Sequence, residues 1–190
     1  MSKKWYTADW HLFHTRLMVK YCDRPFKSLD EMHAALVYGV NSVVAKNDEL
    51  YILGDVCLDT CKPRRAVCSD LSVFDIIKRS NGRKHLIVGN HDPSNLVKSR
   101  IWETVSQYKE IKDNGQRVVL FHYPILSWNK RAKGSVHLHG HCHGTLRNVS
   151  GDDHHSEVGF RCDVGVDCWD FKPVSLDDVF KKFFQNGRIV

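Results

Sequence analysis

The chain has 190 residues, which is enough for one compact domain with a sizeable core and too short for two ordinary domains. Hydrophobic residues make up 42% of it and charged residues 26%, a composition that excludes an intrinsically disordered protein. The 28 Lys and Arg residues against 22 Asp and Glu leave a net charge of +6, which suits an anionic substrate but does not identify one.

Short apolar runs predict six β-strands, in chain order over residues 5–8, 49–53, 85–88, 117–121, 136–139 and 161–166. Amphipathic stretches between and after these runs predict four helices. Ser28 and Glu31 have the spacing of a capping box, and apolar residues recur at helical spacing from there to Val43. The other helices are predicted over 66–79, over 94–108 and from Ser175 onward. This alternation of strands and helices predicts a single layered α/β domain.

Cysteine usage and the N-terminal sequence bear on the compartment. The seven cysteines are odd in number in a chain that is not small, which argues against a disulfide framework. We therefore expect reduced, mostly buried thiols and a cytoplasmic protein. No signal peptide is visible, and no apolar run approaches the roughly 18 residues of a membrane span, so no membrane association is expected.

Histidine is over-represented, with 12 residues, and histidine is both the commonest metal ligand and a proton shuttle near neutral pH. Residue types that bind metals cluster directly after five of the predicted strands: Asp9 and His11, Asp55, Asn90 with His91 and Asp92, His122, and His141 with His143. Open α/β sheets place their sites in loops at the carboxyl ends of strands, so we expect these side chains to converge.

The donor types agree with one another chemically. Carboxylate, amide and imidazole groups suit divalent Mn, Fe, Co, Ni or Zn. Two such ions about 3.5–4 Å apart, bridged by one carboxylate, can hold a hydroxide and clamp both oxygens of an in-line displacement at phosphorus. Glycines precede Asp55, Asn90 and His141, and they permit tight turns and close approach of a substrate.

Taken together, the five motifs resemble the signature of the calcineurin-like metallophosphoesterases. The segments 8–14, 24–26, 53–56 and 164–167 resemble those of its small bacterial and phage members. The resemblance spans roughly residues 4–180. It implies a four-layered sandwich of two mixed β-sheets flanked by helices, formed by a single domain over 1–190 with no cap domain.

The resemblance also implies the role of each motif residue. The first metal ion would be bound by Asp9, His11 and His143, the second by Asn90, His122 and His141, and Asp55 would bridge the two. The expected cofactor is therefore a pair of divalent transition-metal ions, Mn first, with Fe, Ni, Co and Zn as alternatives. The bridging hydroxide would attack phosphorus. His91 would stabilise charge at the phosphate or protonate the leaving group, and Asp92 would orient His91 and raise its pKa.

Four further residues are candidate substrate contacts: His14, Arg24, Trp128 and Arg131. His14 can touch a phosphate oxygen and Arg24 can face the cleft. Trp128, with the cations after it, can stack on a base and hold a phosphate. Packing or solvation is the plain alternative for each of them. The polar stretch from Asn148 to Gly159 is expected to be an exposed loop without an assigned role.

The leading interpretation is a metal-dependent phosphoester hydrolase. A cleft without a cap favours phosphodiesterase activity, while phosphomonoesterase and nucleotide pyrophosphatase activities stay open, as does the oligomeric state. The partner would be a phosphoester, including a nucleotide or a nucleic acid. The alternative of a different class is a non-catalytic metal-binding or nucleic-acid-binding module. A scaffold that had lost its metals would show gaps at the ligand positions, and the sequence shows none. A nucleic-acid-binding module with structural zinc would need closed Cys/His sets and clustered Lys and Arg, whereas the histidines here pair with Asp and Asn and the cations are dispersed.

Overall fold

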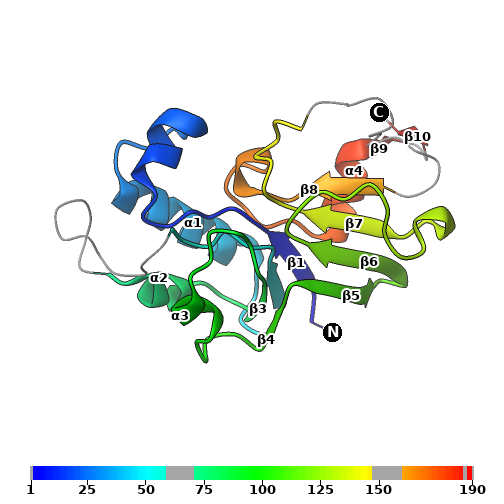
Figure 1. Cartoon of the computed structure of the whole chain (residues 1–190), viewed down its shortest axis with the longest axis horizontal. Helices are drawn as coiled ribbons and strands as arrows, with labels where there is room; N and C mark the ends of the chain where they lie inside the picture. The colour runs from blue at the N-terminus through cyan, green and yellow to red at the C-terminus, as the bar shows by residue number, and fades with distance from the viewer. Residues whose placement is uncertain (1, 59–70, 147–159, 186–187, 190) are drawn as a thin grey trace.

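The computed structural model describes residues 2–58, 71–146, 160–185 and 188–189. Two four-stranded sheets form its centre (Figure 1). The first is parallel throughout and has the order β1 (Lys4–Thr7), β2 (Glu49–Ile52), β3 (Arg83–Ile87) and β4 (Thr104–Ser106). The second has the order β5 (Tyr108–Asp113), β6 (Gln116–Phe121), β7 (Val136–His139) and β8 (Phe160–Asp163). In the second sheet β5 pairs antiparallel with β6 and the other pairings are parallel, so this sheet is the mixed one.

The helices cover the first sheet and close the core between the sheets. Helices α1 (Leu29–Val43), α2 (Val73–Arg79) and α3 (Ser94–Val97) share a core cluster with one face of the first sheet. Its opposite face packs on the second sheet, and α4 (Leu176–Phe183) contributes to that second core. The short helical turns are η1 (Leu17–Tyr21), η2 (Arg131–Lys133) and η3 (Val166–Cys168), and β9 (Phe184–Gln185) pairs with β10 (Arg188–Ile189).

Strand alternation explains how one sheet serves two cores. Trp5 of β1 and Leu50 of β2 face the helices, whereas Tyr6 and Tyr51 face the second sheet. The far side of the second sheet is covered by the connection 122–135, where the Tyr123 carbonyl oxygen lies 3.1 Å from Nε2 of His137. The expected α/β sandwich of two sheets flanked by helices is therefore confirmed, with only the second sheet mixed.

Most predicted elements are confirmed to within a few residues. The strand predicted over 136–139 is β7, and the capping box is formed, because Ser28 Oγ accepts the Glu31 backbone N–H at the start of α1. In the helix predicted over 66–79 the described part is helical from Val73, and residues 66–70 lie outside the described residues. The loop predicted from Asn148 to Gly159 lies entirely outside the described residues.

The helix predicted over 94–108 is wrong beyond its first turn. Helix α3 ends at Val97, and residues 104–106 form β4, whose β-branched Thr104 and Val105 favour a strand. A hairpin follows, in which Asn114 and Gly115 join β5 to β6 with φ values of 46° and 82°. Such Asn-Gly turns match the twist of paired strands, so this dipeptide was the signal in the sequence that could have predicted the hairpin.

The described helices include none with the length and hydropathy of a membrane span. In the described part of the chain Cys22, Cys142, Cys162 and Cys168 are free thiols, as expected. The expectation that the cysteines are mostly buried does not hold there, because Cys57 and Cys162 are buried and the other three are partly exposed.

The Asp48 carboxylate links the start of β1 to the segment before β2 by hydrogen bonds. It accepts the backbone N–H of Lys3 at 2.9 Å, the indole N–H of Trp5 at 2.9 Å and the backbone N–H of Ala45 at 3.0 Å. Although burial acts to raise it, these hydrogen bonds hold the pKa of Asp48 below its ordinary value.

Asp48→Asn should lower the free energy of unfolding by about 1–3 kcal/mol, because it leaves buried donors without an acceptor. Since the pKa of Asp48 is lowered in the folded chain, its contribution is present above the unfolded-state pKa of about 3.9 and is lost as the pH falls below it. Urea unfolding of the wild type and of Asp48→Asn from pH 7 to pH 2 checks this. The difference between their free energies of unfolding should shrink toward zero at the acid end. The exposed Asp177→Asn variant is the control, and an equal loss there would contradict the assignment to Asp48.

Candidate metal centre

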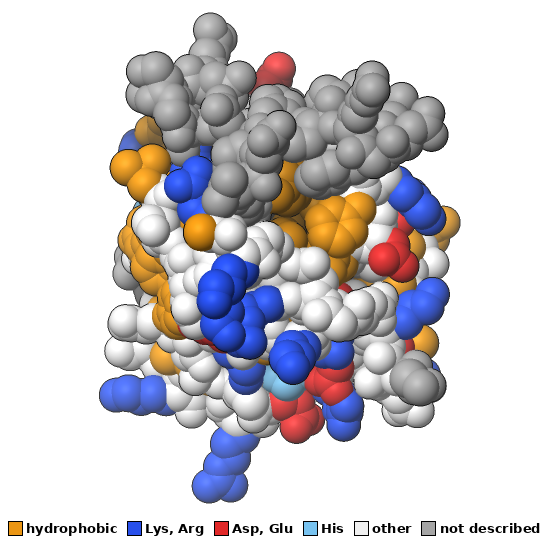
Figure 2. Space-filling model, turned by 90° about the vertical axis from the view of Figure 1, so that its right-hand side faces the viewer, with side chains coloured by type: hydrophobic (Ala, Val, Ile, Leu, Met, Phe, Trp, Pro, Cys, Tyr) orange, Lys and Arg blue, Asp and Glu red, His pale blue; other side chains and the backbone are white. Residues whose placement is uncertain are grey.

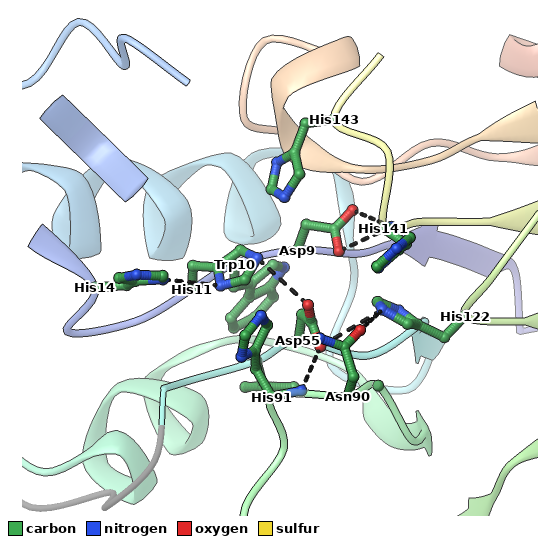
Figure 3. A network of polar contacts seen from close by, with 12 residues as sticks. Asp9, Trp10, His11, His14, Asp55, Asn90, His91, His122, His141 and His143 are labelled. Atoms are coloured by element: carbon green, nitrogen blue, oxygen red, sulfur yellow. Dashed lines mark hydrogen bonds and ion pairs between the residues drawn. The ribbon is translucent and has the colours of Figure 1, made fainter. Parts of the chain in front are cut away.

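The polar side chains that follow the strands meet where the two sheets join. Asp9, Asp55 and Asn90 follow β1, β2 and β3 of the first sheet, while His122 and His141 follow β6 and β7 of the second. Figure 3 shows these side chains, with those of His11, His91 and His143, pointing toward a common space. The structure therefore brings together all seven residues that were expected to bind metal.

The backbone of this centre is held in strained conformations. Asp9, His11, Asp55, His141 and His143 have positive φ values of 58°, 49°, 54°, 72° and 48°, in a region that non-glycine residues seldom adopt. Such strain persists only where surrounding contacts over-determine it, and it concentrates at functional sites. Hydrogen bonds between loops provide those contacts, from the Asp9 N–H to the Gly54 carbonyl and from the His11 N–H to the Asp55 carbonyl.

Gly89 shows why glycine precedes the ligand loop of β3. A Cβ atom on Gly89 would lie 2.3 Å from Oδ1 of Asp55 and 2.5 Å from its backbone nitrogen. Gly54, with a φ of 86°, would place a Cβ 2.6 Å from Nδ1 of His122. Both positions therefore require glycine because other groups of the protein approach them closely, and the expected approach of a substrate stays a prediction.

The first cluster consists of Asp9, His11 and His143, whose potential ligand atoms lie within 4.8 Å of one another. The Asp9 carboxylate is buried and accepts the His141 backbone N–H at 2.9 and 3.1 Å. Nε2 of His11 is buried and has no hydrogen-bond partner within the described part of the chain. A buried imidazole nitrogen with no proton partner is the kind of atom that a metal ion satisfies.

The second cluster consists of Asp55, His122 and His141, also with potential ligand atoms within 4.8 Å. The Leu53 carbonyl oxygen lies 2.7 Å from Nδ1 of His122, so Nδ1 carries the proton and Nε2 presents a lone pair. That lone pair faces Oδ1 of Asn90 at 3.1 Å and Oδ1 of Asp55 at 3.5 Å. Acceptors that face one another in this way fit a cation placed between them.

Asp55 stands between the two clusters. Its Oδ2 lies 3.5 Å from Nε2 of His11, and its Oδ1 lies 3.5 Å from Nε2 of His122. Oδ1 also accepts the backbone N–H of His91 at 2.9 Å. The side chain is 2% exposed, so neither oxygen is freely hydrated. Each oxygen is thus directed at one cluster, which is the arrangement of a bridging carboxylate.

Burial controls the electrostatics of the centre. It raises the pKa of Asp9 well above its ordinary value and lowers the pKa of His11 and of His122. In His143 burial acts in the lowering direction, but the hydrogen bonds to Asp167 and Cys22 and the nearby Asp9 carboxylate together outweigh it and raise the pKa to about 10. The raised pKa of Asp9 means that a negative charge on this buried group is not fully compensated within the protein. Divalent cations would compensate that charge and bind the neutral rings of His11 and His122, so the residues fit a metal pair.

His91 and His14 stand at the accessible side of the centre. Both line a cavity of about 800 Å³, together with His11, Asp55, His141 and His143 and with apolar side chains that include Phe13, Leu17, Leu29 and Leu58. Nδ1 of His14 lies 3.4 Å from Nδ1 of His11, and the His91 ring packs edge-on against His11 at 5.5 Å. Both residues therefore face the cavity next to the centre.

Asp92 has a different role from the one expected. Its carboxylate accepts the backbone N–H groups of Asp55, Val56 and Gly89 at 3.1, 2.8 and 2.8 Å. It is thereby committed to the loop that carries Asp55 rather than to the ring of His91, which corrects the expectation that Asp92 orients His91. Burial raises the pKa of the Asp92 carboxyl itself.

Three of the expected substrate contacts do not reach the cavity. The Arg24 guanidinium is fully buried and bonded to the protein, so it does not face the cleft. Trp128 is 9% exposed, donates its indole N–H to the Ser135 carbonyl oxygen, and packs against His137 of the second sheet. Arg131 lies over the Trp128 ring at 5.3 Å.

On the face of the molecule in Figure 2, Lys and Arg side chains are interspersed with Asp and Glu.

Asp167 is the residue of the centre to which sequence reasoning gave no role. Its Oδ2 lies 2.6 Å from Nδ1 of His143, and Sγ of Cys22 lies 3.3 Å from the same nitrogen. The available signal was the segment 164–167, which was noted only as part of the resemblance. A carboxylate behind a metal-binding histidine is common, but spacing along the chain does not reveal it.

Two curated proteins resemble this chain in sequence over nearly its whole length. No family model matches the chain. Protein MJ1445 of Methanocaldococcus jannaschii, described as uncharacterized, is 30% identical over 196 residues, which cover 100% of this chain and 96% of that protein. The gene 66 protein of Mycobacterium phage L5 is 30% identical over 207 residues, with 95% and 93% covered.

Solved structures are similar at lower identity. The protein of unknown function AQ665 from Aquifex aeolicus has a TM-score of 0.73 at 21% identity, covering 96% of this chain and all of that one, so the fold is shared. YfcE, a phosphoesterase from E. coli, has a TM-score of 0.44 at 18% identity, covering 84% and 77%, which is too weak for an argument about activity. By its sequence relationships, the chain belongs to the family that includes protein MJ1445 and the gene 66 protein of phage L5.

Proposed function

We propose that this protein is a phosphoester hydrolase that uses two divalent transition-metal ions, with phosphodiesters as its preferred substrates. The observation that carries the proposal is the position of Asp55, whose two carboxylate oxygens each face a histidine nitrogen of a different cluster at 3.5 Å. A single carboxylate shared by two sets of O and N donors is what a dinuclear centre needs. The sequence signature after the five strands points to the same chemistry.

The donor set suits Mn, and also Fe, Ni, Co or Zn, because it mixes carboxylate and amide oxygens with imidazole nitrogens. When bound, two such ions activate water and offset charge on the phosphate during in-line displacement. The first ion would be held by Asp9, His11 and His143, and the second by Asn90, His122 and His141, with Asp55 between them. The protein's own part is to hold these donors rigidly.

His91 is the group best placed to act on the substrate itself. Its backbone N–H donates to Asp55 at 2.9 Å, which anchors the residue beside the centre, while its ring lines the cavity. An exposed imidazole there can hold a phosphate oxygen or donate a proton to the leaving oxygen. His14 lines the same cavity and is a second candidate contact for the phosphate.

The size of the cavity favours a diester over a small monoester. A volume of about 800 Å³ lies in the range that takes drug-sized ligands and exceeds the needs of one phosphate group. Apolar side chains on its lining, such as Phe13 and Leu17, can pack against organic groups on phosphorus. Nucleotides and nucleic-acid ends belong to the same substrate class.

The deciding experiment is hydrolysis by metal-stripped protein to which Mn, Ni, Zn and Mg are returned separately. The substrates are a bis-aryl phosphodiester, an aryl monophosphate and cyclic nucleotides. We expect activity to disappear on stripping, to return best with Mn, and to be highest on the diester. A better monoester rate would favour a phosphomonoesterase, and bound metal without turnover on any substrate would favour a non-catalytic module.

Metal-saturated protein should contain two transition-metal ions per chain. Each ion would have four protein donors if Asp55 is shared, which leaves room for water. Elemental analysis by mass spectrometry of dialysed, Mn-saturated protein measures the ratio. One tightly bound ion at saturation would contradict the bridged pair.

Asp55→Asn should weaken binding of both ions, by more than the roughly 10–100-fold that loss of a supporting residue costs, because the bridging charge is removed. Calorimetric titration with Mn²⁺ measures the binding of the first and of the second ion. Asn90→Ala is the matched control, since Asn90 is a proposed ligand of the second ion only and its loss should spare the first ion. Unchanged metal content together with lost activity in Asp55→Asn would show that the bridging role is misassigned.

His91→Ala should keep its metal ions and its fold and lose about 10²–10⁴-fold in turnover, the usual contribution of general acid catalysis. The loss should be larger for an alkoxide leaving group, which needs a proton, than for an aryl oxide of low pKa. Turnover of wild type and variant on both substrates checks this. Equal losses would leave charge stabilisation as the role of His91, and loss of the metals would remove it from the catalytic residues.

A further inference from the structure

Arg24 and Asp167 form a buried ion pair directly behind the first cluster. Nε of Arg24 donates to Oδ1 of Asp167 at 2.7 Å, and Nη2 donates to Oδ2 at 2.8 Å. None of the Arg24 side chain is exposed, and that of Asp167 is 11% exposed. Two parallel hydrogen bonds between planar groups fix their relative orientation, so the Asp167 carboxylate has little freedom to turn.

The fixed carboxylate is bonded to a metal-ligand histidine. Oδ2 of Asp167 lies 2.6 Å from Nδ1 of His143, so Asp167 accepts the Nδ1 proton and leaves Nε2 as the nitrogen available to an ion. The ring of His143 stacks at 5.1 Å on that of His11, another member of the first cluster. Rotation of His143 out of this position would cost the short hydrogen bond to Asp167.

The same guanidinium holds the backbone at Asp9. Nη2 of Arg24 donates to the Asp9 carbonyl oxygen at 2.7 Å, and Nη1 donates to the Trp10 carbonyl oxygen at 2.9 Å. Asp9 has a φ of 58°, so its conformation needs such external contacts to persist. One arginine therefore fixes the backbone of one ligand and, through Asp167, the ring of another.

We propose that Arg24 and Asp167 are positioning residues for the first metal ion and not for the second. This inference rests on the metal centre of the proposed function. The second cluster has its own orienting contact, because the Leu53 carbonyl oxygen lies 2.7 Å from Nδ1 of His122. Loss of the ion pair should therefore weaken one site selectively, whereas a general loss of stability would weaken both.

The test measures Mn²⁺ binding by calorimetry in two backgrounds that each keep one site. Asn90→Ala keeps the first site, and His11→Ala keeps the second. Adding Asp167→Asn should weaken Mn²⁺ binding about 10–100-fold in the first background and leave it unchanged in the second. An unchanged first site, or equal losses in both backgrounds, would overturn the proposal.

Matched variants separate positioning from other causes. Asp48→Asn removes a buried, hydrogen-bonded carboxylate at the opposite end of the first sheet and should leave Mn²⁺ affinity unchanged. Cys22→Ala tests the sulfur 3.3 Å from Nδ1 of His143 and should also leave it unchanged, since the carboxylate holds the ring. A loss of affinity in Cys22→Ala equal to that in Asp167→Asn would assign the orienting role to the sulfur instead.

Arg24→Lys keeps the charge but cannot form the paired hydrogen bonds, so it should weaken the first site as Asp167→Asn does. Circular dichroism checks that each variant is folded, and Arg24→Lys supplies the measurement if Asp167→Asn fails to fold. If the wild-type protein binds no Mn²⁺, both the proposed metal centre and this inference are wrong. If Asp167→Asn and Arg24→Lys bind Mn²⁺ with wild-type affinity, only the positioning role is wrong.

Discussion

Two buried carboxylates, Asp9 and Asp55, set the constraint on which the rest of the site depends. Burial of a charged group costs several kcal/mol unless a partner compensates it. Neutral His11 and His122 and the amide oxygen of Asn90 lie beside these carboxylates, while the buried Arg24 directs its hydrogen bonds to Asp167 and to backbone carbonyls. A pair of divalent cations would compensate the buried negative charge. The architecture around the site holds the ligands of those cations in fixed positions.

Holding them still requires strain, and the fold offsets that strain with rigid supports. Five of the expected ligands have left-handed backbone conformations, each directly after a strand or within a few residues of one. Loop-to-loop hydrogen bonds stabilise those conformations, and the Asp92 carboxylate adds three more across the loops of β2 and β3. The parallel strands behind the loops anchor them on two well-packed cores.

The side chains of the centre differ in how firmly they are held. His122 and His143 are each oriented through Nδ1, by a backbone carbonyl and by a carboxylate respectively. His91 is anchored by its backbone and has an exposed ring on the cavity. Firm orientation suits a ligand whose donor atom must stay in place, and a freer ring suits a group that meets a substrate and exchanges a proton with solvent.

The amino-acid sequence by itself determined the α/β class, most strands, the capped helix at Ser28 and the set of ligand residue types, because these depend on local periodicity and on short motifs. It misjudged residues 98–108, where a predicted helix stands in place of strand β4, and it overlooked the Asn114–Gly115 turn after β5. Only the tertiary structure decided that Arg24 and Asp92 serve the loops, that Trp128 packs on the second sheet, and that Asp167 supports His143. Those roles depend on contacts between segments distant along the chain, and spacing within one segment carries no information about which distant group will lie against it.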